Sequence, residues 1–252
     1  MTGTAAKRLD GRRIILFGGG SGIGKATAEL FAREGARLAI VDHDRTAATA
    51  VAEAVGGVAI AADISDAPQV KAAVDGANAA LEGIDGLVNT AGVFDPADLE
   101  NTAPDLWNQV IGINLTGTYL VCRHALPHLR RAAPATIVTL GSGVALVPTG
   151  PTSAAYVAAK GGVIALTRQM AMEAAPLVRA NCVCPGMVDT PMTRTILRDD
   201  TGETRSSITG SYALKRAAAP GEIAAAILFL TSRDSSYVTG TAMAVDGGRT
   251  FH

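Results

Sequence analysis

An apolar run, a glycine-rich turn and a helical pattern follow one another near the start of the chain. Residues 13–17 are mostly apolar, which predicts a short buried strand. Glycine occupies most of positions 18–24, and a helical pattern runs from 25 to 34. Because glycine has no side chain, the backbone N–H groups of such a turn and the helix N-terminus can approach a pyrophosphate. Strand, turn and helix in this order predict a dinucleotide-binding fold.

Apolar runs and helical patterns alternate along the rest of the chain, as is typical of a parallel sheet covered on both faces. We therefore expect an α/β protein with a Rossmann-like, doubly wound, seven-stranded and mostly parallel sheet. No repeat or linker interrupts the pattern, so residues 1–252 are expected to form a single domain, with residues 1–11 as a flexible tail. The predicted strands are 13–17, 37–41, 58–61, 84–88, 135–140, 241–245 and one around Cys182; the predicted helices are 25–34, 46–55, 68–81, 105–131 and 223–230.

The charge of the chain is nearly balanced, with 22 basic and 23 acidic residues and a formal net charge of −1. This balance argues against nucleic acid or an anionic membrane surface as a partner, and the aliphatic run 223–230 is too short to span a bilayer. An odd number of cysteines favours reduced thiols and a cytoplasmic protein. Cys182 and Cys184 are expected to pack on one face of a strand. His124 and His128 lie one turn apart without an evident third ligand, so no metal site is expected.

An acidic residue ends the second predicted strand. Asp42 follows Gly24 by 18 residues, close to where dinucleotide-binding folds place an acid on the adenosine ribose. A carboxylate there accepts hydrogen bonds from the ribose hydroxyls and repels a 2′-phosphate, so NAD is favoured over NADP. The nearby Arg45 keeps NADP open as an alternative. Asp42 could also cap the helix that follows Asp44, and both roles are compatible.

Tyr156 and Lys160 stand four residues apart and therefore share one side of a helix. A buried lysine beside a tyrosine favours the phenolate, because a positive charge lowers the pKa of a neighbouring acid. Such a tyrosine can carry a proton near neutral pH, although the pair alone is also compatible with packing. Ser142 follows the carboxyl end of a predicted strand, and ligands bind at the carboxyl ends of the strands in such a sheet. Asn114 is an amide among apolar neighbours and needs hydrogen-bond partners.

The ordered set of these motifs resembles the short-chain dehydrogenase/reductase family over residues 12–248. The resemblance implies that Tyr156 is the acid/base, that Ser142 holds the substrate oxygen, and that Asn114 holds a water in a proton relay. Lys160 would bind the nicotinamide ribose and lower the tyrosine pKa. The family also implies a homotetramer. The motifs are 18–24, Asp63, 89–92, Asn114, Ser142, Tyr156 with Lys160, 181–186, Thr190 and 245–248.

The resemblance also implies a cofactor-binding set. Small residues after the fourth strand, Ala91 and Gly92, would let a ligand lie against the backbone. The remaining contacts would come from Gly18, Ser21, Gly22, Ile23 and Gly24 on the phosphates, Asp42 on the adenosine ribose, Asp63 and Ile64 on the adenine, Asn89 on the neighbouring ribose region, Tyr156 and Lys160 on the nicotinamide ribose side, and Pro185, Gly186, Val188 and Thr190 on the nicotinamide.

Three positions depart from the family pattern. Phe17 stands where a threonine usually begins the turn, so a hydroxyl that braces the turn is lost. Thr90 replaces the second residue of a double asparagine. The spacing from Ser142 to Tyr156 is one residue longer than is usual, and the alternative position, Gly143, has no hydroxyl. We therefore take Ser142 as the active serine, followed by one inserted loop residue.

These features predict reversible hydride transfer between NAD(H) and a secondary alcohol or its ketone, with a small-molecule partner. An NADP-dependent ketone reductase of the 3-oxoacyl type and a non-catalytic nucleotide-binding regulator remain alternatives. An enoyl reductase is disfavoured because its tyrosine and lysine are more widely separated. Residues 192–214 are expected to form a mobile substrate lid. The apolar floor under it is expected to include Phe94, Val144, Leu146, Val147 and Met187.

Overall fold

A parallel sheet runs through the described part of the chain, which comprises residues 7–148, 150, 153–199 and 201–250 of a computed structural model. Within these residues the sheet has seven strands in the order β3-β2-β1-β4-β5-β6-β7, and all neighbouring strands pair in parallel. The predicted α/β, doubly wound sheet is confirmed. The strands are β1 (Arg13–Phe17), β2 (Arg37–Asp42), β3 (Val58–Ala61), β4 (Gly86–Asn89), β5 (Ala135–Leu140), β6 (Val178–Pro185) and β7 (Ala242–Val245).

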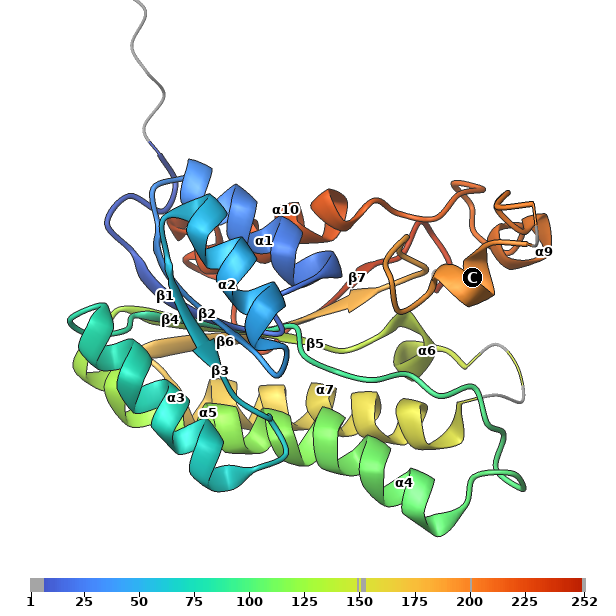
Figure 1. Ribbon diagram of the computed structural model, residues 1–252, viewed down its shortest axis with the longest axis horizontal. Coiled ribbons are helices and arrows are strands. Elements are labelled where there is room, and N and C mark those ends of the chain that lie inside the picture. Colours follow the sequence, from blue (N-terminus) through green and yellow to red (C-terminus); the bar gives the residue numbers. More distant parts are fainter. Residues whose placement is uncertain (1–6, 149, 151–152, 200, 251–252) are drawn as a thin grey trace, which may run out of the picture.

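Helices cover both faces of this sheet (Figure 1). One layer contains α1 (Gly22–Arg33), α2 (Arg45–Val55) and α10 (Pro220–Thr231), and the other contains α3 (Ala67–Ala80), α5 (Gly117–Arg131) and α7 (Ala154–Ala174). The shorter elements are α4 (Pro104–Ile111), a π-helical turn η1 (Gly112–Thr116), α6 (Gly143–Leu146), α8 (Arg194–Leu197), α9 (Ser206–Thr209) and a 3₁₀ turn η2 (Arg233–Ser235).

The central strands are mostly apolar because each of their faces meets a helical layer. In β1, Ile15 and Phe17 belong to the core under α3, α5 and α7, whereas Ile14 and Leu16 belong to the core under α1, α2 and α10. This split follows from the two-residue period of a strand, which sends successive side chains to opposite faces. A parallel sheet buried on both faces therefore produces continuous apolar runs rather than alternation.

The order of the strands reverses at β1, which lies between β2 and β4. The connections from β1 run outward in one direction through β2 and β3, and in the other through β4 and β5. At such a switch point the loops after the strands diverge and leave a crevice at the carboxyl edge of the sheet. Phe17, the last residue of β1, pairs with Val41 on one side and Asn89 on the other. The crevice therefore opens beside Phe17.

One sequence-based expectation about the fold needs correction. Residues 7–11, assigned to a flexible tail, are held by the fold: Leu9 is buried in the core under α1, and an Arg8 nitrogen lies 2.8 Å from a Glu34 oxygen. Residues 1–6 lie outside the described part. The helical region expected over 105–131 is confirmed; it comprises α4, the π-helical turn η1 and α5 without interruption. No helix in the described ranges is long and apolar enough to cross a membrane.

Candidate active site

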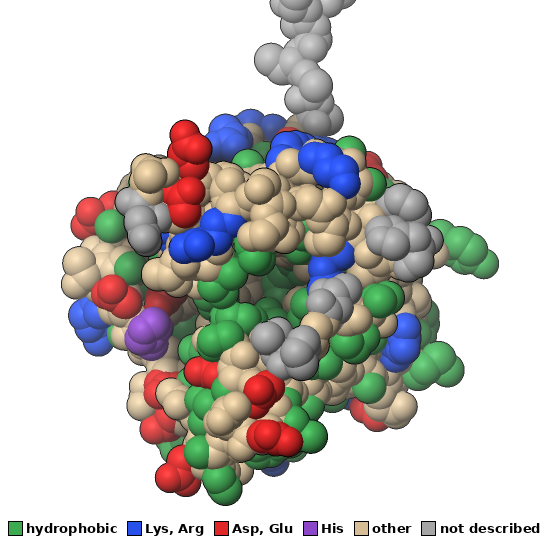
Figure 2. Space-filling view, turned by 90° about the vertical axis from the view of Figure 1, so that its right-hand side faces the viewer, with side chains coloured by type: hydrophobic (Ala, Val, Ile, Leu, Met, Phe, Trp, Pro, Cys, Tyr) green, Lys and Arg blue, Asp and Glu red, His purple; other side chains and the backbone are tan. Residues whose placement is uncertain are grey.

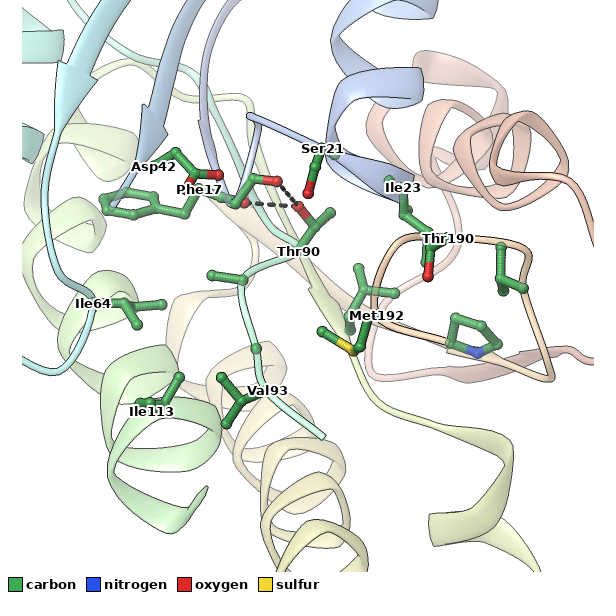
Figure 3. Close-up of a pocket in the computed structure, with 18 of the residues that line it drawn as sticks. Phe17, Ser21, Ile23, Asp42, Ile64, Thr90, Val93, Ile113, Thr190 and Met192 are labelled. Atoms are coloured by element: carbon green, nitrogen blue, oxygen red, sulfur yellow. Dashed lines mark hydrogen bonds between the residues drawn. The ribbon is translucent and has the colours of Figure 1, made fainter. Parts of the chain in front are cut away.

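A cavity of about 350 Å³ opens along the carboxyl ends of the central strands. Figure 2 shows it as a hollow surrounded largely by hydrophobic side chains. In Figure 3, Asp42 and Ile64 lie at one end, and Thr190 and Met192 lie at the other. Among the predicted site residues, those that line the cavity are Gly18, Ser21, Gly22, Ile23, Gly24, Asp42, Asp63, Ile64, Ala91, Gly92, Ser142, Tyr156, Lys160, Pro185, Gly186, Val188 and Thr190.

The two predicted asparagines lie behind the cavity wall. Asn89 donates to Thr118 Oγ1 at 2.9 Å and accepts from the Ala91 N–H at 3.2 Å, so it supports the backbone that lines the cavity. The Asn114 amide is matched to the backbone of Val93, donating to its oxygen at 2.9 Å and accepting from its nitrogen at 3.0 Å. Asn114 is fully buried within η1. The water that the family resemblance assigns to Asn114 stays a prediction.

The glycine turn is shaped by close backbone approaches. Gly18 has a φ of +72°, and a Cβ there would lie 2.4 Å from the Ala91 nitrogen. A Cβ on Gly24 would lie 2.0 Å from the Gly18 oxygen, so a side chain would push α1 off the turn. At Gly22, whose φ is +50°, a Cβ would lie 3.3 Å from Thr190 Cγ2 and narrow the space between the turn and the opposite wall. The turn therefore fits a pyrophosphate held at the N-terminus of α1.

The Asp42 carboxylate is held in position at the end of β2. Its Oδ2 accepts from the Gly20 N–H at 2.9 Å, and its Oδ1 accepts from the Asp44 N–H at 3.1 Å and lies 3.0 Å from His43 Nδ1. Asp44, not Asp42, caps α2, because its side chain accepts from the nitrogens at the start of that helix. Arg45 is exposed and does not line the cavity.

Tyr156 shares a hydrogen bond with Ser142, which follows the end of β5. Phe94 lies edge-on against the Tyr156 ring, with 5.1 Å between ring centroids. On α7, Lys160 Nζ lies 5.7 Å from the centroid of the tyrosine ring. The structure therefore brings together the serine, tyrosine and lysine of the predicted catalytic set, and it is Ser142, rather than Gly143, that lines the cavity.

Burial shifts the pKa values of Tyr156 and Lys160 in opposite directions. It raises the pKa of Tyr156 above its ordinary value, and the hydrogen bond with Ser142 only partly opposes that rise. It also lowers the pKa of Lys160 to about 8. The family resemblance predicts that Lys160 lowers the Tyr156 pKa. In the described structure the Tyr156 pKa is raised instead, because desolvation disfavours both the tyrosine phenolate and the charged lysine.

The predicted lid is tied to the cavity wall at both ends. Thr193 Oγ1 contacts the Val188 oxygen and Thr190 Oγ1, the latter at 3.0 Å. The Tyr212 hydroxyl accepts from the Met187 N–H at 3.1 Å. Within the lid, Asp200 lies outside the described residues. The prediction for the floor is not borne out, because none of its five residues lines the cavity: Phe94, Val144, Leu146, Val147 and Met187. Phe94 contacts the cavity only through the Tyr156 ring.

Several lining residues were missed by the sequence analysis. Val93 is apolar and sits directly beside a recognised motif, which is the signal that could have found it. The missed set is Phe17, Val41, His43, Ala62, Thr90, Val93, Ile113, Leu140, Gly141 and Pro191. Met192 and Thr193, which also line the cavity, lie in the predicted lid.

The cysteines and histidines outside the cavity have packing and ion-pair contacts. Cys182 and Cys184 are buried with their sulfurs 3.9 Å apart, which confirms that they share one face of β6. His128 Nε2 lies 3.3 Å from Asp75 Oδ1. No group of three or more histidine, cysteine or acidic residues that could hold a metal occurs within the described ranges.

Comparisons with known proteins agree with this geometry. A family model described as enoyl-(acyl carrier protein) reductase matches residues 18–250. The chain is 39% identical over 253 residues to 2-(S)-hydroxypropyl-CoM dehydrogenase 3 of Xanthobacter autotrophicus, covering 97% of this chain and 99% of that protein. It is 35% identical over 249 residues to a cyclopentanol dehydrogenase of a Comamonas species, covering 96% and 98%.

A solved structure also matches over nearly the whole chain. The crystal structure of the 3-ketoacyl-(acyl-carrier-protein) reductase of Brucella melitensis complexed with NADH has a TM-score of 0.89 at 33% identity, covering 96% of this chain and 100% of that one. The fold, the cavity and these likenesses together define an oxidoreductase of the kind that uses a nicotinamide cofactor. The chain belongs to the short-chain dehydrogenase/reductase family.

Proposed function

We propose that the protein is an NAD-dependent dehydrogenase that transfers a hydride between NAD(H) and a small, uncharged secondary alcohol or its ketone. One observation carries the proposal: Tyr156, hydrogen-bonded to Ser142, lines the same cavity whose far end holds the Asp42 carboxylate. This arrangement supports Tyr156 as a proton carrier and Asp42 as a ribose-binding acid for one extended cofactor.

The proposed chemistry divides between the cofactor and the chain. Bound NAD would supply the hydride acceptor, whereas the protein supplies position and proton transfer. In oxidation, the Tyr156 phenolate takes the proton of the alcohol, and the Ser142 hydroxyl holds the alcohol oxygen. Lys160, whose Nζ donates a hydrogen bond to the Leu140 main-chain oxygen, would bind the nicotinamide ribose. Phe94 packs against the Tyr156 ring and restricts its orientation.

The preference for NAD is supported by the surroundings of Asp42. Its oxygens face N–H groups and His43, and its negative charge would repel a 2′-phosphate. His43 lies beside this carboxylate, and Arg45 does not line the cavity. NADP therefore lacks a fixed cation at this end within the described residues.

The proposal of an uncharged substrate rests on the opposite end of the cavity. The side chains there include Val93, Val188 and Met192, and Lys160 is the one lysine or arginine among the described lining residues. Since Lys160 serves the catalytic pair, the described lining residues offer no further lysine or arginine for an anionic tail. A cyclic or branched alcohol fits this lining better than a sulfonated or phosphorylated substrate. Residues 192–214 would close over it as a lid.

The test follows the appearance of NADH absorbance with a panel of neutral secondary alcohols, such as cyclopentanol, against hydroxyacyl thioesters and 2-hydroxypropyl-CoM. Turnover with neutral alcohols and NAD, lost in Tyr156→Phe, is the expected outcome. Faster reduction of a 3-oxoacyl thioester with NADPH would establish the reductase alternative. Oxidation of NADH by an enoyl thioester would instead support the activity named by the family model. Cofactor binding without turnover on any substrate would favour a regulator.

The assembly and location belong to the same proposal. The family resemblance supports a homotetramer. Light scattering coupled to size-exclusion chromatography tests this assembly. A cytoplasmic location rests on cysteines that are free and buried in the described structure. Fractionation of cells that express the protein tests that location.

A further inference from the structure

The Thr90 hydroxyl lies where the glycine turn meets the end of β4 (Figure 3). Its Oγ1 donates to the Phe17 oxygen at 2.8 Å and lies 3.1 Å from the Gly18 oxygen. The Thr90 N–H also donates to the Phe17 oxygen, at 2.9 Å. A single residue at the end of β4 thus holds two successive carbonyl groups at the start of the turn.

We propose that Thr90 is a positioning residue for the dinucleotide, because its hydroxyl holds the glycine turn in the shape that receives the cofactor phosphates. This inference rests on the proposed function. Thr90 lines the cavity, but the geometry assigns its effect to the turn rather than to the reacting atoms.

The Thr90 hydroxyl affects the glycine turn through its contact with the Gly18 carbonyl oxygen. Gly18 adopts a left-handed conformation, with φ at +72°, and its oxygen lies 2.0 Å from where a Cβ on Gly24 would stand. The same Cβ would lie 2.6 Å from Thr90 Oγ1. The hydroxyl, the turn and the first turn of α1 therefore meet at one place. A shift of the Gly18 carbonyl would move the N–H groups at the start of α1, which are the groups that face a bound phosphate.

The two unusual residues of the turn are structurally coupled. Phe17 provides no hydroxyl to brace the turn, and its ring is buried in the core beneath α3 and α5. Thr90, in the position expected to hold an asparagine, provides that hydroxyl from the neighbouring strand. The brace is therefore present, but it comes from β4 rather than from β1.

A purely structural role predicts a different result from a positioning role. Thr90→Val keeps the size and branching of the side chain and removes the donor, whereas Thr90→Ser keeps the donor and removes the methyl group. Loss of one hydrogen bond of this kind is expected to weaken NADH binding about threefold to tenfold. Thr90→Ser is expected to bind NADH within about twofold of wild type. Titration of NADH by its fluorescence measures both.

Thr231→Val provides the matched control. Thr231 is fully buried in α10, its hydroxyl donates to the Ile227 oxygen at 2.8 Å, and it does not line the cavity. This variant should lose thermal stability comparably to Thr90→Val while it keeps the wild-type affinity for NADH. In steady-state kinetics, Thr90→Val should raise the KM for NAD more than the KM for the alcohol.

The outcomes separate this inference from the proposed function. Wild-type affinity in a folded Thr90→Val variant would overturn the inference and leave the dehydrogenase proposal intact. An equal loss in Thr90→Ser would overturn it as well, because packing rather than the hydroxyl would then be responsible. If Thr90→Val does not fold, the Thr90→Ser affinity alone decides, and a loss of tenfold or more overturns the inference. A wild-type protein that binds neither NADH nor NADPH would refute the proposed function itself.

Discussion

Lys160 Nζ donates a hydrogen bond to the Leu140 main-chain oxygen at 2.9 Å. Leu140 is the last residue of β5, and Ser142, the hydrogen-bond partner of Tyr156, follows it by two residues. The lysine therefore fastens α7 to the same strand end that carries the serine. This contact holds the tyrosine and the serine in register, so loss of Lys160 should affect position as well as charge.

Lys160→Met should change how stability depends on pH. Burial lowers the Lys160 pKa from 10.5 to about 8, so between these values the unfolded chain binds more protons than the folded chain. Burial of the charged Lys160 therefore lowers the free energy of unfolding. This destabilisation is largest below about pH 8 and diminishes as the pH rises. We expect wild type to gain about 1 kcal/mol relative to Lys160→Met between about pH 7 and pH 9. Urea unfolding at several pH values measures this difference, and parallel curves for the two proteins would contradict it.

Tyr156→Phe should retain NADH binding and lower kcat by about 10²-fold to 10⁴-fold, because it removes the proton carrier. Since burial raises the pKa of Tyr156, the wild-type rate of alcohol oxidation should still be rising above neutral pH, where more phenolate forms. Steady-state rates across pH, with NADH fluorescence titrations as the binding control, check both statements. Substantial activity in Tyr156→Phe would remove Tyr156 from the mechanism.

Asp42→Asn should shift the cofactor preference. The amide can still accept from the Gly20 N–H, but it lacks the charge that repels a 2′-phosphate. The ratio of kcat/KM for NAD to that for NADP should fall about 10-fold to 100-fold, as expected when a charged hydrogen-bond partner is lost. The measurement compares both cofactors with one alcohol. An unchanged ratio would show that Asp42 does not select the cofactor.

Gly18→Ala should weaken both the fold and dinucleotide binding. The new Cβ would lie 2.4 Å from the Ala91 nitrogen, at a φ of +72° that alanine rarely adopts. Gly221→Ala is the matched control, because nothing lies within 4 Å of its added Cβ and it stands in the first turn of α10. The control is expected to gain up to about 1 kcal/mol of stability from helix propensity. Thermal unfolding and NADH titration of the two variants test this contrast, which equal behaviour would refute.

The sequence analysis placed the central elements because their signals are local. An apolar run, a turn that needs glycine and a helix start are each recognisable within a few residues, and β3 and β5 were predicted with their observed bounds. It was wrong where distant contacts decide. Leu9 looked like part of a polar tail, but α1 buries it. The π-helical turn η1 inside the predicted helical region was not foreseen, because the residues around Asn114 carry no proline and no strong local signal.

The amino-acid sequence alone determined the α/β class, the glycine turn, the acid after β2 and the pairing of Tyr156 with Lys160, because periodicity and residue chemistry are properties of short segments. The tertiary structure alone decided how the pKa values of that pair are shifted, since desolvation depends on which segments surround a side chain. It also decided that Thr90 braces the turn next to Phe17, because residues 73 positions apart become neighbours only when β1 and β4 pair in the sheet.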